Sequence, residues 1–183
     1  MLIQGYYSAF NGVQVPAEVE VQWRTGDAPL NATNIAYVKV ISLDGAGNSG
    51  EISLEGLTEG EYYLLVKHFN HLAVITEQKI EFQAGEVSKV NLSEADSPDF
   101  YGCYGILPLW QENNGKLSLR AGNADGNIYV NIADFIIWRV ANGSSPGTPE
   151  WDPRANFDGN EFINIIDFGL WRWNNGFQAY IPP

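Results

Sequence analysis

The sequence predicts a mainly β protein in two parts, an antiparallel β-sandwich over residues 1–115 and a small α module of two loop-helix repeats over residues 116–183. Three observations predict this. Hydrophobic residues make up 45% of the chain and charged residues 17%, as in globular proteins. In the first part, short apolar runs alternate with turn signals about every 8–12 residues, which is typical of a sandwich. In the second part, residues 123–143 and 156–176 are near copies of one another.

The strands of the sandwich are predicted from runs of β-branched and aromatic residues between turns such as Asp44-Gly45 and Glu59-Gly60. The candidate strands are 2–8, 15–24, 36–43, 50–57, 61–69, 72–82, 86–92 and 116–120. Residues 37–43 alternate between two faces, as a half-buried strand does. The expected core residues are Val19, Val21, Val38, Val40, Leu54, Tyr62, Leu64, Val66, Val74 and Val90.

The charge and the apolar pattern exclude several classes of function. Ten basic against 22 acidic residues give a net charge of −12, which argues against nucleic acid or an anionic membrane surface as partner but leaves room for bound cations. The apolar runs are too short to span a bilayer, and no charged segment followed by an apolar one opens the chain as a signal peptide would. Catalytic motifs are absent from the sequence, so we expect a protein that is not an enzyme.

The two copies lie 33 residues apart without a gap and each begins with a twelve-residue loop. Oxygen-bearing side chains recur at loop positions 1, 3, 5, 9 and 12, a spacing that suits Ca²⁺, with a backbone carbonyl expected from position 7. The predicted ligands of two calcium ions are Asn123, Asp125, Asn127, Tyr129, Asn131 and Asp134, and Asn156, Asp158, Asn160, Phe162, Asn164 and Asp167. The alternative is that side-chain turns hold these loops without metal.

Apolar residues and glycines complete each repeat. Position 8, Val130 and Ile163, is predicted to join the two loops through a short β-bridge. Helices are predicted over 132–142 and 165–175, each followed by a glycine, Gly143 or Gly176, that can adopt a left-handed cap.

This loop-helix duplication resembles a bacterial dockerin, the calcium-dependent docking module of cellulosome-type assemblies. Aspartate at position 12 and Val/Ile-Asn at positions 8 and 9 carry the resemblance over residues 121–177. Two departures predict weak sites: asparagine stands at position 1, and Ile128 and Glu161 stand at position 6, where glycine is usual. The resemblance implies a partner-facing surface at loop positions 10 and 11, which are Ile132, Ala133, Ile165 and Ile166. The alternative for Ile132 and Ile165 is a core position.

The segment containing Gly60, Tyr62, Leu64 and Val66 resembles a strand of a carboxypeptidase-regulatory-like or similar immunoglobulin-like sandwich. Such sandwiches stand directly before dockerins in bacterial exported proteins, where they are called X modules and support the dockerin. This domain order implies an extracellular or cell-surface protein. His68 and His71 are expected to make ordinary hydrogen bonds in a turn.

The expected function is therefore calcium-ordered assembly with a protein partner. The partner is either a cohesin-like receptor or further copies of the chain, which would form a filament. Self-assembly by strand addition would use the segment Met1–Phe10 or the tail Phe177–Pro183. A third possibility is a carbohydrate-binding sandwich that uses exposed tryptophans such as Trp23 or Trp110.

Overall fold

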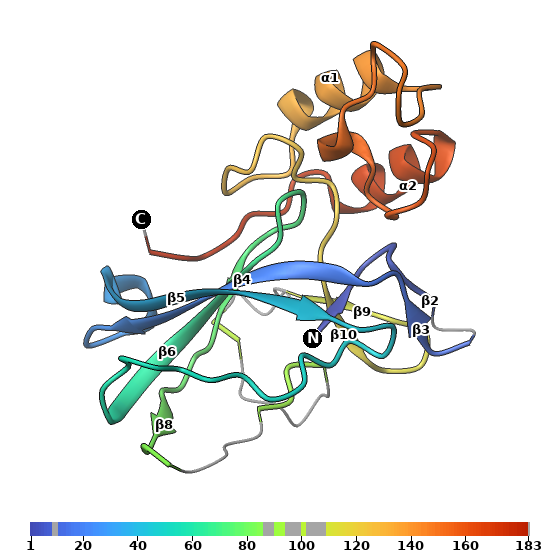
Figure 1. Cartoon of the computed structure of the whole chain (residues 1–183). Coiled ribbons are helices and arrows are strands. Elements are labelled where there is room, and N and C mark those ends of the chain that lie inside the picture. The colour runs from blue at the N-terminus through green and yellow to red at the C-terminus, as the bar shows by residue number, and fades with distance from the viewer. Residues whose placement is uncertain (9–10, 86–89, 94–99, 102–108, 183) are drawn as a thin grey trace.

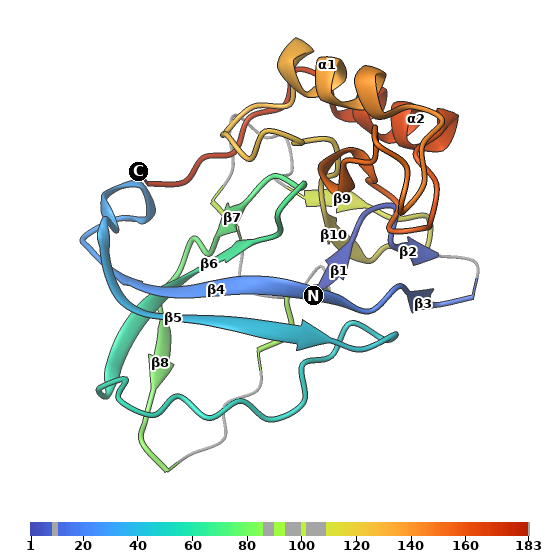
Figure 2. The same cartoon turned by 45° about the horizontal axis from the view of Figure 1, so that its top comes forward.

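The computed structural model describes residues 1–8, 11–85, 90–93, 100–101 and 109–182. Two α-helices lie together at one end of a body made of short sheets (Figures 1 and 2). The strands are β1 (Leu2–Ile3), β2 (Tyr7–Ser8), β3 (Val13–Gln14), β4 (Ala17–Thr25), β5 (Asn34–Leu43), β6 (Gly60–Lys67), β7 (Val74–Ile75), β8 (Ile80–Phe82), β9 (Leu109–Gln111) and β10 (Leu117–Leu119). The helices are α1 (Ile132–Ala141) and α2 (Ile165–Asn174), with 3-10 turns at η1 (Pro29–Asn31) and η2 (Pro153–Ala155).

The body is a sandwich of two main sheets. One has the order β5-β4-β6-β7, with β8 also paired to β6, and the other has the order β1-β10-β9. Side chains from both sheets, including Val19, Val66, Leu109 and Leu119, form one buried core. The predicted fold class, mainly β with a sandwich and a small α module, is confirmed. The core of the sandwich includes Leu119, whereas Ala121 belongs to the core of the helical module.

Strand β5 presents to the core the face opposite to the one predicted. In the antiparallel register, Val19 lies across from Ile41 and Trp23 from Tyr37, so these residues share the core face. Val38 and Val40 point the other way and are 45% and 58% exposed, so their prediction as core residues was wrong. The other predicted core residues are buried or packed against the core: Val19, Val21, Leu54, Tyr62, Leu64, Val66, Val74 and Val90.

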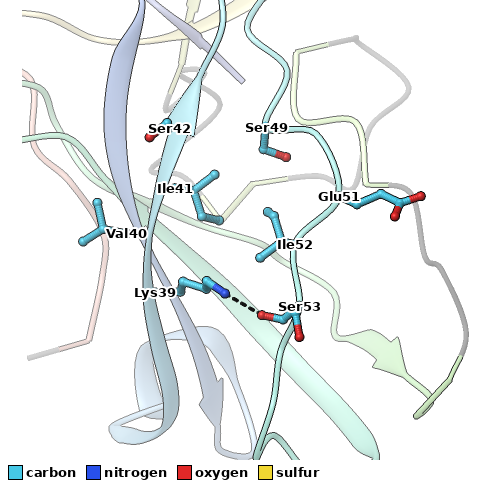
Figure 3. Close-up of a pocket in the computed structure, with 8 residues that line it drawn as sticks. All are labelled: Lys39, Val40, Ile41, Ser42, Ser49, Glu51, Ile52 and Ser53. Carbon is cyan, nitrogen blue, oxygen red and sulfur yellow. Dashed lines mark hydrogen bonds between the residues drawn. The ribbon is translucent and has the colours of Figure 1, made fainter.

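Residues 50–57 do not form the predicted strand. The segment runs beside the free edge of β5, and a pocket of about 240 Å³ separates the two (Figure 3). The Lys39 ammonium crosses this gap and donates to the Ser53 carbonyl at 2.6 Å. Ile52 and Leu54 pack against the sandwich core, so their burial comes from side-chain packing without strand pairing. Of the predicted strand 86–92, residues 86–89 lie outside the described residues, and 90–92 are not strand.

The helices begin and end close to the predicted positions. Asn131 and Asn164 are the N-caps, and Asp134 and Asp167 complete a capping box in each helix, which satisfies backbone donors at the helix start. Gly143 and Gly176 have φ angles of 90° and 95°, the left-handed conformation predicted for them. Aromatic rings from the two helices pack together between them: Phe135, Trp138, Phe168 and Trp171.

Both terminal segments pack within the same chain. β1 pairs in parallel with β10, and β2 pairs with β3. Residues of the tail pair with the first repeat, where the Ala179 amide donates to the Ile128 carbonyl at 2.7 Å, and Ile181 packs against the outer face of the sandwich beside Leu65. Within the described residues, no helix has the length and apolar character needed to cross a membrane.

Candidate metal centre and docking face

Loop 1 (residues 123–134) and loop 2 (residues 156–167) have the same conformation, set by side-chain turns. In loop 1 the Asn127 amide donates to Asp125 Oδ1 at 3.0 Å and the Tyr129 amide donates to Asn127 Oδ1 at 2.6 Å. Loop 2 repeats both bonds at the equivalent positions. A glycine with positive φ stands at position 4 of each loop, Gly126 at 72° and Gly159 at 69°. Polar side chains at odd positions therefore fold each loop around a common centre.

The carboxylate at position 12 closes each loop. Asp134 and Asp167 are fully buried. One oxygen of Asp134 accepts from the Asp125 amide at 3.1 Å and the other from the Asn131 amide at 2.7 Å, so the carboxylate holds both ends of the loop. Asp167 does the same in loop 2 with the Phe157 and Asn164 amides. An ionised carboxylate has about four acceptor sites, and backbone amides occupy three of them in each loop, so about one remains for a cation.

The side chain at position 1 of each loop has a buried acceptor that fits a cation ligand. Asn123 and Asn156 are 2% and 7% exposed. Each Nδ2 donates to the carbonyl at position 5 of its own loop. Each Oδ1 has no hydrogen-bond partner among the residues that the structure describes. Leaving a buried acceptor unpaired costs about 1–3 kcal/mol, and here the same atom is unpaired in both repeats.

The electrostatics of the loops also fit a cation. Burial raises the pKa of the Asp134, Asp158 and Asp167 carboxyls, and the pKa of Asp167 reaches about 6. The nearby charge of Asp158 adds to the rise of the Asp167 pKa. Ionised carboxylates in these surroundings are unfavourable on their own, and an adjacent divalent cation would stabilise them. The side-chain turns account for the shape of the loops, but not for the unpaired oxygens.

The donor set is one of amides, carbonyls and few carboxylates. No cluster of three or more His, Cys, Asp or Glu side chains suited to a metal occurs in the part of the chain that the structure describes. Each loop instead pairs two aspartates with asparagine oxygens, a combination that suits a hard cation such as Ca²⁺. Asn131 and Asn164 at position 9 use Oδ1 to cap their helices. The exposed side chains of Tyr129 and Phe162 leave position 7 to act through its backbone carbonyl.

Each repeat contacts the other through crossed contacts, in which the loop of one repeat bonds residues in or after the helix of the other. The predicted β-bridge between Val130 and Ile163 was wrong. Val130 exchanges backbone hydrogen bonds with Gly176 and Phe177, which follow α2. Ile163 exchanges them with Gly143 and Ser144, which follow α1. Position 8 thus pairs with the residues after the helix of the other repeat, because the antiparallel helices bring those residues beside it.

The tryptophans continue this crossed arrangement. The indole N–H of Trp138 on α1 donates to the Asn164 carbonyl of loop 2 at 3.1 Å. The indole N–H of Trp171 on α2 donates to the Asn131 carbonyl of loop 1 at 2.9 Å. Each helix therefore holds position 9 of the loop that begins the other helix.

A turn of the sandwich contacts both loops. Asn70, fully buried between β6 and β7, accepts from the Asn123 amide at 3.1 Å through its carbonyl and donates from Nδ2 to the Asn156 carbonyl at 2.8 Å. Nearby, Gln4 Oε1 accepts from the Ala121 amide and from Asn174 Nδ2. Neither residue was predicted from the sequence, because a single polar residue in a turn or near the terminus carries no motif.

The predicted partner-facing residues lie on the surface. Ile132 and Ile165 are 63% and 70% exposed, which excludes the core position for both within this chain, and Ala133 and Ile166 are exposed as well. On α1 the apolar row continues through Ile136 and Val140. These two residues were missed, although their spacing of four from Ile132 predicts one helix face.

The remaining sequence candidates are placed as follows. Burial lowers the pKa of His68 to about 4, and its Nδ1 lies 2.9 Å from Nδ1 of His71, whose Nε2 hydrogen-bonds the Gln4 carbonyl. The expected turn hydrogen bonds are present. Trp23 is buried in the sandwich core with its ring edge-to-face against Tyr37. Trp110 stacks on the exposed Trp173 of α2, with ring centroids 6.1 Å apart.

Comparison with solved structures identifies chains that have a similar fold. A chain from the crystal structure of a type II cohesin–X-dockerin complex of Acetivibrio cellulolyticus, a C-terminal interface mutant, matches with a TM-score of 0.55 and 11% identity over 97% of this chain and 92% of that chain. The fold is that of an X module followed by a dockerin-like module. A chain from the N-terminal interface mutant of the same complex matches over 94% of this chain and 88% of that chain, with a TM-score of 0.46 and 11% identity. No protein-family model and no curated protein matches the sequence.

Proposed function

We propose that this chain is a non-catalytic, calcium-ordered docking module that acts outside the cell. The observation that carries the proposal is the exposed apolar row Ile132, Ile136 and Val140 on a helix that begins inside loop 1. Apolar side chains exposed together on one face mark a contact surface for another protein. The net charge of −12 makes a nucleic acid or an anionic membrane a poor partner.

Calcium would connect the loops to this surface. In each loop the ligands would be the position-1 oxygen, which has no partner in the described part of the chain, the two aspartates, the position-5 amide oxygen and the position-7 carbonyl. A bound divalent cation supplies the positive charge that lets the buried carboxylates stay ionised. Because Asp134 and Asp167 are also the N3 residues of α1 and α2, fixing them fixes where each helix begins and thus where its apolar face points.

The preferred partner is a cohesin-like receptor. The fold supports this choice, since the matched structure is a cohesin complex, and the apolar face supports a protein rather than a glycan partner. Trp23 lies in the core, which removes one of the two tryptophans that a sugar-binding surface would use. The residues of both terminal segments that the structure describes pair within the chain, so strand addition between copies would first require them to detach.

The test is titration calorimetry of the full chain against type II cohesin domains, in millimolar calcium and in chelator. We expect binding in calcium only, and loss of binding in Ile132→Asp and Ile136→Asp. Leu30→Asp is the matched control, because Leu30 is an exposed apolar residue on η1 at the sandwich. Binding that survives chelation or both helix variants would refute the proposed role. Light scattering on the same samples distinguishes a 20.3 kDa monomer from a self-assembled form.

A further inference from the structure

The β6–β7 turn of the sandwich holds the first residue of both loops at one point. The Asn70 carbonyl accepts from the backbone amide of Asn123, and its side-chain amide donates to the backbone carbonyl of Asn156. The His71 carbonyl adds a longer contact of 3.4 Å to Asn123 Nδ2. Asn70 is fully buried, so water does not compete for these bonds.

The residues that Asn70 holds are those with the unpaired oxygens. Asn123 and Asn156 each have a buried Oδ1 without a partner, and a neutral amide oxygen is a weaker calcium ligand than the carboxylate usual at this position. A weak ligand contributes more when it is already in place, because binding then costs less conformational entropy. Fixing the backbone of both asparagines from one residue, through its backbone carbonyl and its side-chain amide, therefore favours both sites together.

The crossed contacts connect the loops by a second route. Val130 of loop 1 pairs with the residues after α2, and Ile163 of loop 2 pairs with those after α1. The two indole N–H groups reach the position-9 carbonyls in the same crossed way. Ordering one loop thus orders part of the framework that the other loop needs, which is the condition for positive coupling between two sites.

We propose that Asn70 is a positioning residue for both calcium sites and that the sandwich thereby makes the two loops fill cooperatively. This inference rests on the proposed calcium binding. It also predicts an asymmetry. The bond to loop 1 uses the Asn70 backbone, whereas the bond to loop 2 uses its side chain, so of the two loop bonds a substitution at Asn70 removes only the second, together with the Asn70 Oδ1 contact to His71 Nδ1.

The experiment measures calcium binding to the full chain by titration calorimetry and by tryptophan fluorescence. Asp134→Ala isolates loop 2 and Asp167→Ala isolates loop 1. In the Asp134→Ala background, Asn70→Ala should weaken calcium binding roughly 5- to 30-fold, because the buried Asn156 carbonyl loses its donor. In the Asp167→Ala background, the same substitution should change the affinity of loop 1 less than twofold.

Gln4→Ala is the matched control, since Gln4 is a buried polar residue at the same junction whose side chain bonds Ala121 and Asn174 outside both loops. Gln4→Ala should change the calcium affinities of loop 1 and loop 2 by similar factors. Equal weakening of both loops by Asn70→Ala would reduce Asn70 to general structural support and overturn the inference.

A second measurement leaves Asn70 intact. Wild-type binding should show a Hill coefficient clearly above 1, and each single-loop variant should bind its one calcium more weakly than the wild type binds two. Independent sites of unchanged affinity would refute the coupling. Absence of any calcium-dependent heat or fluorescence change in the wild type would instead refute the calcium proposal itself.

Discussion

Calcium binding to loop 2 should be strongly dependent on pH, because Asp167, one of the proposed ligands, has a pKa raised to about 6. Burial raises the pKa of Asp167 to about 6 from 3.8. In the calcium-free chain this raised pKa favours the protonated form, so its contribution to stability is complete below pH 3.8 and is lost as pH rises through 6. Calcium requires the ionised form and therefore competes with the proton.

The magnitude follows from the fraction that is ionised. With a pKa of about 6, roughly nine-tenths of Asp167 is ionised at pH 7 and roughly one-tenth at pH 5. The calcium affinity of loop 2 should therefore fall about tenfold between pH 7 and pH 5, or about 1.4 kcal/mol. At pH 6, binding should release about half a proton per calcium ion.

Titration calorimetry of Asp134→Ala, in which only loop 2 binds, measures this directly. Repeating the titration at pH 6 in buffers of different ionisation enthalpy gives the number of protons released. The pKa of His68 is lowered to about 4 by burial, so this residue stays neutral at pH 5, and far-UV circular dichroism checks that the fold is kept. An affinity that is constant within twofold from pH 7 to pH 5 would refute the reasoning.

Three further predictions concern stability, measured by chemical denaturation in calcium. Gly126→Ala should lower the free energy of unfolding by about 1–2 kcal/mol, because alanine is strained at this positive φ. Gly159→Ala should lower it distinctly more, because its Cβ would also lie 2.7 Å from the Tyr6 ring. Equal losses in the two variants would contradict this. Trp138→Phe and Trp171→Phe should each lower the free energy of unfolding by about 1–3 kcal/mol, since each removes the indole donor of a position-9 carbonyl and leaves it only the longer bond from the helix amide four residues on. A loss in only one variant would argue against the crossed arrangement. Val40→Lys should change the free energy of unfolding by less than about 0.5 kcal/mol because Val40 is exposed, whereas Val19→Ala should lower it by about 2 kcal/mol because Val19 is buried. The reverse order would place Val40 in the core, as the sequence predicted.

The loops and helices were predictable from the sequence because their chemistry is local. Caps, turn residues and candidate ligands recur at fixed spacing within twelve residues, and duplication makes the spacing visible. The assignment of these residues as ligands and as a docking face remains a prediction. The face of β5 was not predictable in the same way, because both faces of residues 37–43 carry apolar side chains and only the register with β4 decides which face is buried.

Contacts between distant segments could not be predicted from the sequence. Position 8 was expected to pair with its own equivalent, as symmetry suggests, but the antiparallel helices bring the residues after the opposite helix closer. Asn70 bonds a partner 86 residues away, and nothing in the sequence around it marks the contact. Residues 50–57 have the composition of a strand, yet their apolar side chains reach the core without backbone pairing.

The crossed pairing has a consequence for how the repeats can be cut and joined. A fragment that ended before Gly176 would keep every candidate ligand of loop 1 but lose Gly176 and Phe177, whose backbone pairs with Val130, so loop 1 depends on residues that follow the helix of the other repeat. A single repeat cut out together with the residues after its own helix would need a second copy to supply those residues, which yields a dimer of repeats. Opening the chain at the exposed connection around Gly147 would place each loop and the residues that pair with its position 8 on different fragments, so the two fragments should stay together through these crossed contacts.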